Sequence, residues 1–293
     1  MFSMLKKTVI AAALVITFAV AASPVDYLSP ESDVCAYVNV SSLLNVTAMQ
    51  QFIPMIESEL QSSGMKLKDF EGELAIGLNL STSGKDVQVN IDAVIELKKA
   101  IAKRLFNLAK ASEKESKSSF IAGRPAFSSK DGRMILQTSN VLIAQFQAEG
   151  KKPLNVLTKS GNNPLKKVAK QIQQFDIVLY ADVEQLMKKM QAAIPADDKD
   201  VAEIASKISK AFLFSKFMQG EKTYLNLSVF CKTAKDAETI AAYAKVFIDT
   251  AARENNELKT VLNKIKNKIE GTRVSYEITL DKNDINMFMQ LAK

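Results

Sequence analysis

The chain has 293 residues, of which 47% are hydrophobic and 24% charged, the balance of a globular protein rather than a fibrous or disordered one. Its length suffices for two domains of about 100 to 150 residues each. The formal net charge is +7 and histidine is absent, which excludes histidine-dependent catalytic triads and typical zinc sites.

The first 22 residues have the pattern of a secretory signal. Lys6 and Lys7 precede an apolar run over residues 8–20, and Ala19 and Ala21 form an A-x-A arrangement before the expected cleavage point. The run is shorter than the roughly 20 residues of a membrane-spanning helix, so an uncleaved anchor is the alternative interpretation. Loss of the two lysines leaves 7 − 2 = +5 on the mature protein. We therefore expect an exported protein, periplasmic or extracellular, with no membrane span after signal removal.

The first repeat is expected over residues 33–150, after an extended lead-in at 23–32 that contains two prolines. Alternation and helical periodicity predict its elements in this order: a strand at 34–40, a helix at 43–62, a hairpin at 72–97, a helix at 98–115, a strand at 118–127 and a short meander. The first six elements have the order β-α-β-β-α-β, which is the ferredoxin-like plan.

Residues 151–174 form a junction with a helix, and the second repeat is expected over 175–293. Its predicted elements are a strand at 175–183, a helix ending near Pro195, a helix at 198–211, a hairpin at 212–231, one long helix or a kinked pair at 234–269, a strand at 272–280 and a terminal helix capped by Asp281. The predicted fold is α+β, a tandem duplication of a ferredoxin-like unit whose antiparallel sheets carry helices on one face.

A strand that occurs twice indicates the duplication. DVCAYVNVSSLL at 33–44 returns as DIVLYADVEQLM at 176–187, with Asp, Tyr, and Asn or Asp at the same spacing. Together with NPLKK at 163–167 and the long helix before the final strand, this pattern resembles uncharacterised exported bacterial proteins with a duplicated α+β domain. The resemblance covers nearly the whole mature chain, has no catalytic signature and implies no activity. We expect the repeats to superpose with Tyr37 on Tyr180 and Asn90 on Asn226.

Alternation along the strands separates an apolar face, which helices must cover, from a polar face. In the first repeat the polar face holds Tyr37, Asn39, Asn90, Asp92 and Glu96. In the second repeat it holds the residues that we take as the candidate ligand-binding site: Tyr180, Asp182, Tyr224, Asn226, Ser228, Arg273 and Glu277. A solvated face, or packing between the two repeats, is the alternative interpretation.

The predicted function is that of a non-enzymatic exported binding or structural protein, which meets an unknown protein or small-molecule ligand through the open sheet face or the surface between repeats. One alternative is a carrier of an apolar small molecule, held between the long helix and the sheet of the second repeat. Another is an enzyme that uses carboxylates such as Asp182 and Glu277 in place of histidine. No catalytic residue, metal site or cofactor is predicted.

Lysines cluster at 98–117, 151–170 and 259–268, where acidic residues interleave with them. We interpret these clusters as solvated helix faces, with weak contact to an anionic envelope surface as the alternative. Nucleic acid is not expected as a partner of an exported chain without tryptophan.

The two cysteines, Cys35 and Cys231, are too few for a disulfide scaffold. Alternation assigns them to opposite faces of separate repeats, and a disulfide needs Cα atoms within about 7 Å and facing side chains. We expect two free thiols, with Cys231 buried and Cys35 the more accessible.

Overall fold

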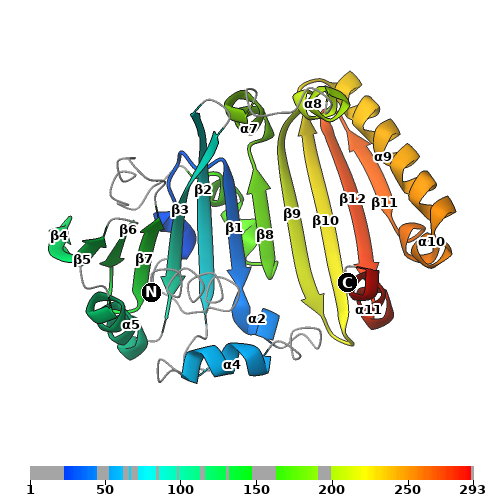
Figure 1. Ribbon diagram of the computed structural model, residues 1–293. Coiled ribbons are helices and arrows are strands. Elements are labelled where there is room, and N and C mark those ends of the chain that lie inside the picture. The colour runs from blue at the N-terminus through cyan, green and yellow to red at the C-terminus, as the bar shows by residue number, and fades with distance from the viewer. Residues whose placement is uncertain are drawn as a thin grey trace. The chain divides into compact units, whose positions relative to one another are not determined.

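The computed structural model describes residues 23–44, 53–61, 66, 72–83, 86–97, 99–112, 116–129, 132–146, 163–190 and 199–291. The expected signal segment and residues 151–162 of the predicted junction lie outside these ranges. The fold is α+β, with antiparallel strands and several helices (Figure 1). The chain divides into two compact units, Met1–Ser81 with Gln88–Asp176, and Thr82–Val87 with Ile177–Lys293.

The strands of the first unit follow the order β1-β2-β3-β7-β6-β5-β4. They are β1 (Val34–Asn39), β2 (Glu73–Ser83), β3 (Asp86–Glu96), β4 (Lys117–Ile121), β5 (Arg124–Ser129), β6 (Gly132–Leu136) and β7 (Val141–Phe146). The helical segments are η1 (Pro24–Tyr27), α2 (Val40–Leu44), α4 (Ile53–Gln61), α5 (Lys99–Ser112), η3 (Pro164–Val168) and α6 (Ala169–Ile172).

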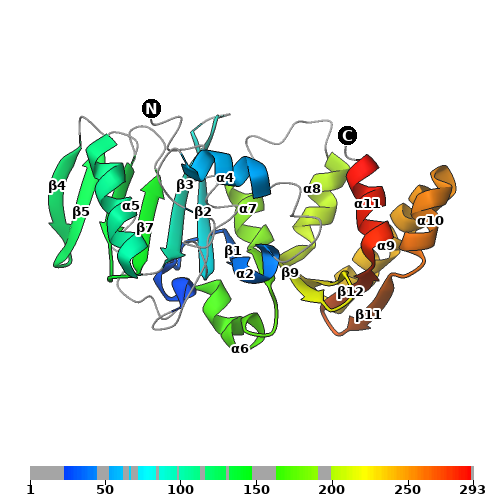
Figure 2. The same cartoon turned by 90° about the horizontal axis from the view of Figure 1, so that it is seen from below.

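The strands of the second unit follow the order β11-β12-β10-β9-β8. They are β8 (Ile177–Ala181), β9 (Ile208–Met218), β10 (Lys222–Cys231), β11 (Lys266–Glu270) and β12 (Arg273–Leu280). The helices are α7 (Val183–Met190), α8 (Lys199–Ser206), α9 (Ala234–Glu254), α10 (Asn256–Leu262) and α11 (Lys282–Leu291). Figure 2 shows α8, α9, α10 and α11 on one side of this unit's strands. Among the described helices, none is both long and apolar enough to span a bilayer.

The ferredoxin-like plan is not confirmed. In a split βαβ unit, a third strand separates the two strands that flank the helix. Here β1 pairs directly and antiparallel with β2, with Val34 opposite Leu78, and β8 pairs in the same way with β9, with Ile177 opposite Ser215. The first three strands of each unit are therefore neighbours in chain order, and the last strand, β7 or β12, lies beside the third.

Three predicted elements differ from the structure. The helix expected at 198–211 ends at Ser206, and the chain from Ile208 onward belongs to β9. The single strand expected at 118–127 is a hairpin of β4 and β5, because Ala122 (φ 48°) and Gly123 (φ 74°) adopt the left-handed conformations of a tight two-residue turn. The helix expected up to residue 269 ends at Leu262, and Lys266–Glu270 instead form β11. Ile265 and Ile269 fit a helical period, but the turn at Gly271 (φ 57°) returns the chain so that β11 pairs with β12.

The repeated Asn or Asp position has a structural role in both units. The backbone N–H of Ser42 donates to Asn39 Oδ1 at 3.1 Å, and that of Gln185 donates to Asp182 Oδ1 at 3.0 Å. Each side chain therefore caps the helix that follows its strand, which satisfies a backbone donor that the helix itself cannot pair. Asp281 acts likewise, since it accepts from the N–H groups of Asn283 and Asp284 at the start of α11.

Helix α5 covers one face of the first unit's sheet. Its buried side chains Ala102, Phe106 and Ala109 pack in a cluster with strand residues that include Ile95, Phe127, Met134 and Leu142. The rings of Phe106 and Phe127 meet edge to face with centroids 5.4 Å apart. The prediction of helices over an apolar sheet face is confirmed here.

The opposite face of this sheet is not open, contrary to the prediction. Tyr37, Asn90, Asp92 and Glu96 are all 6% exposed or less. The lead-in lies over it rather than remaining extended, with its apolar side chains Val25, Tyr27 and Leu28 buried.

Gly77 on β2 shows how closely the lead-in approaches. A Cβ at Gly77 would lie 2.4 Å from Ser32 Oγ and 3.5 Å from a methyl group of Leu28, so a larger residue would push the segment away. Two further contacts fix the lead-in: Asn163 Nδ2 donates to the carbonyl of Val25 at 2.5 Å, and Lys166 pairs with Asp26 at 2.9 Å.

Both cysteines are free, and both are buried. The prediction for Cys231 agrees with its 5% exposure, whereas that for Cys35 is wrong, because the lead-in covers its face and leaves it 0% exposed. Burial raises the pKa of the Cys35 thiol to about 12 and also raises the pKa of Cys231.

We expect neither thiol to react with an aromatic disulfide reagent at pH 8 in the native protein, because thiolate formation is suppressed and access is blocked. Two thiols per chain should react in denaturant. Rapid native labelling of Cys35, measured by the mass of its tryptic peptide, would contradict the covered face.

Buried carboxyl groups lie beneath the lead-in. Gln145 Nε2 donates to Asp92 Oδ1 at 2.7 Å, and Asn140 Nδ2 donates to Glu96 Oε1 at 2.7 Å. Burial raises the pKa of Asp92 to about 6, and burial together with the negative charge of Glu73 raises the pKa of Glu96 to about 7. The folded state therefore holds these protons at pH values where the unfolded chain has released them.

The pKa of each carboxyl group is higher in the folded protein than in the unfolded chain. Each group therefore contributes its full stabilisation at pH values below its unfolded pKa, and this stabilisation is lost as the pH rises through its folded pKa. A rise in pH from 5 to 8 should lower the unfolding free energy by about 2 kcal/mol through the ionisation of Glu96 alone. Glu96→Gln should stabilise the protein by a similar amount at pH 8 and change little at pH 5. Urea titrations at both pH values measure this, and the exposed Glu238→Gln should follow the wild-type profile.

Candidate functional site

The second unit has a sheet face that lies opposite α8–α11 (Figure 2). We call it the polar face. Antiparallel register brings its side chains into rows across β9, β10, β12 and β11. It comprises Lys210, Phe212, Phe214, Lys216, Met218, Lys222, Tyr224, Asn226, Ser228, Phe230, Lys266, Lys268, Glu270, Arg273, Ser275, Glu277 and Thr279.

A hydrogen-bonded network joins five of the seven candidate ligand-binding residues. Arg273 Nη2 donates to Ser228 Oγ at 2.9 Å, and Ser228 Oγ donates to Asn226 Oδ1 at 2.8 Å. Asn226 Nδ2 in turn donates to Glu277 Oε1 at 3.0 Å and reaches the Tyr224 hydroxyl at 3.4 Å. Asn226 and Ser228 are buried, so the network holds the half-buried Arg273 and the exposed Glu277 in fixed positions.

The ring of Phe230 lies between two cations. Lys210 Nζ is 5.3 Å from its centroid and the guanidinium of Arg273 is 5.9 Å from it, both within cation–π range. Phe230 also meets Phe212 edge to face with centroids 6.0 Å apart. Arg273 Nε is buried and has no hydrogen-bond partner within the described part of the chain, so a donor is left over at this point.

Positive charge dominates the polar face. The polar face contains six cationic side chains and two carboxylates, so its net charge is 6 − 2 = +4. The cations are Lys210, Lys216, Lys222, Lys266, Lys268 and Arg273, and the carboxylates are Glu270 and Glu277. Lys268 and Glu270 pair at 2.5 Å. Lys210 and Lys216 are exposed, and neither has an ion-pair partner among the described residues.

The other two candidate residues lie apart from the network. Tyr180 is buried at the β8 end, where its ring packs on Phe212 with centroids 5.0 Å apart and its hydroxyl donates to Asp182 Oδ2 at 3.3 Å. Asp182 caps α7 as described above. These contacts account for both residues structurally.

The structure does not bring Asp182 and Glu277 together as a catalytic pair. Glu277 lies on β12, and two strands, β10 and β9, separate β12 from β8. Three strand spacings amount to about 14 Å, too far for two carboxyl groups to act on one bond. Among the described residues, no group of three or more His, Cys, Asp or Glu side chains could hold a metal ion.

Five residues of β9 belong to the polar face but were absent from the sequence-based prediction: Lys210, Phe212, Phe214, Lys216 and Met218. Their alternation in KAFLFSKFM is visible in the sequence. The face to which these side chains belong depends on the turn Gln219–Glu221, because this turn sets the register that places Lys216 opposite Tyr224 and Lys210 opposite Phe230.

Helix α9 packs on the other face of this sheet. Its residues Ala237, Ile240 and Ala241 are buried against Val229, Cys231 and Val274, which makes this region a packed core cluster. Farther along the same helix, large apolar side chains are exposed: Tyr243, Val246 and Phe247.

The comparisons with known proteins identify the fold alone. No protein-family model matches the sequence, and no curated protein matches it. A solved structure of TP0453, in its crystal form III, is similar with a TM-score of 0.53 and 13% sequence identity, over 92% of this chain and 98% of that chain. Crystal form IV of TP0453 matches with a TM-score of 0.50 and 12% identity, over 92% of this chain and 97% of that chain.

Asn226→Ala should lower the unfolding free energy by about 1–3 kcal/mol, because it removes the centre of the network and leaves buried polar groups without partners. Chemical denaturation measures the change. Thr279→Ala, an exposed substitution on the same face, should stay within about 0.5 kcal/mol of wild type. Equal effects of the two substitutions would show that the network adds nothing to stability.

Proposed function

We propose that the chain is an exported, non-enzymatic binding protein, periplasmic or extracellular, whose polar face receives an acidic partner. The single observation that supports this most directly is the charge of the face, +4, with Lys210 and Lys216 exposed and without ion pairs among the described residues. An excess of one sign of charge on a flat surface attracts a partner of the opposite sign and steers its approach. The signal-like first 22 residues support export.

The arrangement of the face favours binding over catalysis. The carboxylate pair that a histidine-free enzyme would need is not formed by Asp182 and Glu277, whereas the network from Arg273 to Glu277 holds donors and an acceptor in place before a partner arrives. Fixed side chains reduce the entropy lost on association. Phe230 and Tyr224, both half-buried, add apolar contact area between the charges.

We infer that the two units arose by tandem duplication, although with a strand plan other than the ferredoxin-like one. The order β1-β2-β3-β7-β6 corresponds to β8-β9-β10-β12-β11. The backbone N–H of Leu97 donates to the carbonyl of Asn140, and that of Cys231 donates to the carbonyl of Thr272, at the end of the third strand in each case.

Counted from these two bonds, Asp92 corresponds to Asn226. This inferred match lies two residues from the match of Asn90 with Asn226 that the sequence predicts. The cross-strand row Asp92, Gln145, Arg133 then corresponds to Asn226, Glu277, Lys266: a carboxylate, an amide and a cation in both units, with the first two exchanged. This agreement of chemistry at paired positions supports common descent.

The proposal is tested with poly-L-glutamate as an acidic probe, by calorimetry on the full mature chain at low ionic strength. Lys210→Gln/Lys216→Gln should weaken binding at least tenfold and reduce its dependence on salt, because two exposed charges of the polar face are lost.

The matched control is Lys245→Gln/Lys259→Gln, which removes the same charge from exposed positions on α9 and α10. It should bind as wild type does, apart from a small effect of net charge. Equal weakening by both double variants would show that overall charge, and not the polar face, attracts the probe.

A further inference from the structure

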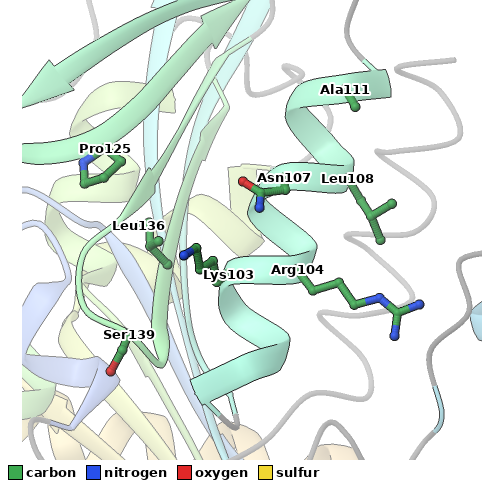
Figure 3. A pocket seen from close by; sticks show the side chains of 8 residues that line it. All are labelled: Lys103, Arg104, Asn107, Leu108, Ala111, Pro125, Leu136 and Ser139. Atoms are coloured by element: carbon green, nitrogen blue, oxygen red, sulfur yellow. The ribbon is translucent and has the colours of Figure 1, made fainter.

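A groove of about 1110 Å³ lies beside α5 in the first unit, far in the chain from the polar face and independent of the function proposed for it. It is lined by Lys103, Arg104, Asn107, Leu108, Ala111, Pro125, Leu136 and Ser139. Figure 3 shows Lys103 and Asn107 extending from α5 toward the strands that carry Pro125 and Leu136, while Arg104 and Leu108 project from the other side of the helix.

The walls of the groove are mainly hydrocarbon. Leu136 lies at the end of β6, where it packs against the buried cluster under α5, and Pro125 is exposed on β5. Leu108 is 42% exposed, although most large aliphatic side chains of this unit are buried. From position 103 to 111 the helix rises about 12 Å, so the apolar wall has the length of a medium-sized aliphatic chain.

Two cationic side chains lie at the end of the groove nearest the N-terminus of α5. Lys103 and Arg104 are exposed, and neither has an ion-pair partner among the described residues. Helix α5, KAIAKRLFNLAKAS, contains no acidic residue, so its positive charge is not balanced within the helix. Asn107 and Ser139 add neutral hydrogen-bonding groups near Lys103.

We propose that this groove binds a small organic carboxylate with an aliphatic body of about eight to twelve carbons. Lys103 attracts the carboxylate, and Ser139 and Asn107 lie within the same lining to donate hydrogen bonds to it. The aliphatic body covers Ala111, Pro125 and Leu136 and removes their surface from water. Apolar walls with a few placed polar groups are the usual composition of a small-molecule site.

The test is calorimetric titration of the full mature chain with decanoate, and with decanol as an uncharged ligand of equal length. Wild type should bind decanoate and bind decanol at least tenfold more weakly. Lys103→Gln should weaken decanoate binding about five- to tenfold without changing the decanol result, since only the charge contact is lost. Ala111→Trp, which fills the groove from the exposed side of α5, should abolish both.

Lys110→Gln is the matched control, because Lys110 is exposed on the same helix but does not line the groove. It should bind decanoate as wild type does. Absence of decanoate binding to wild type, equal loss in Lys110→Gln, or equal affinity for decanol would each overturn the proposal. So would retention of the protein by phosphatidylglycerol vesicles without binding of free decanoate, because the anionic surface would then be the ligand.

Discussion

Antiparallel pairing between the third strand and the last strand of each unit decides which side chains share a face. In the first unit this pairing sets Asp92 opposite Gln145, and in the second it sets Asn226 opposite Glu277. A shift of either strand by one residue would turn these polar groups into the helix-covered cores and carry Ala93 or Leu227 outward. The packing of α5, the buried carboxyl groups and the polar face all depend on this register.

The same row of side chains has different surroundings in the two units. Beneath the lead-in, Asp92 and Gln145 are each 1% exposed, and the hydrogen bond between them compensates part of the cost of burial. In the second unit Glu277 and Lys266 are exposed, and Asn226 at the end of the row is buried. A buried carboxyl group favours its protonated form. Only the row in the second unit has charged side chains that are exposed to solvent.

Periodicity in the sequence predicts most elements, because strands in both units alternate between apolar and polar residues, and α5 and α9 have clear apolar stripes. Periodicity does not identify the element where the same residues fit both a helical and a strand period. Ile265 and Ile269 fit the apolar stripe of a helix, but Ile269 lies in the edge strand β11. Periodicity also fails at Ala122, whose left-handed conformation gives no signal in the sequence. Strand order lies beyond local patterns altogether, since it depends on which strands pair across the sheet.

For the candidate site, alternation correctly assigns Tyr224, Asn226, Ser228, Arg273 and Glu277 to one face, and the structure joins them in one network. It could not show that the corresponding face of the first unit is covered. That coverage comes from Val25, Tyr27 and Leu28, in a segment whose prolines favour an extended conformation and whose contacts are remote in sequence. Local patterns contain no information about such contacts.

The position of the lead-in has a consequence for the order of events during synthesis. Val25 is among the earliest residues of the described chain to leave the ribosome, yet the side chain that binds its carbonyl belongs to Asn163, 138 residues later. A contact of this separation carries a large loop-closure cost and forms late. Until residues 163–166 emerge, the face that contains Cys35, Asp92 and Glu96 is without part of its cover. A chain that ends before residue 163 therefore lacks the two contacts that fix the lead-in over this face.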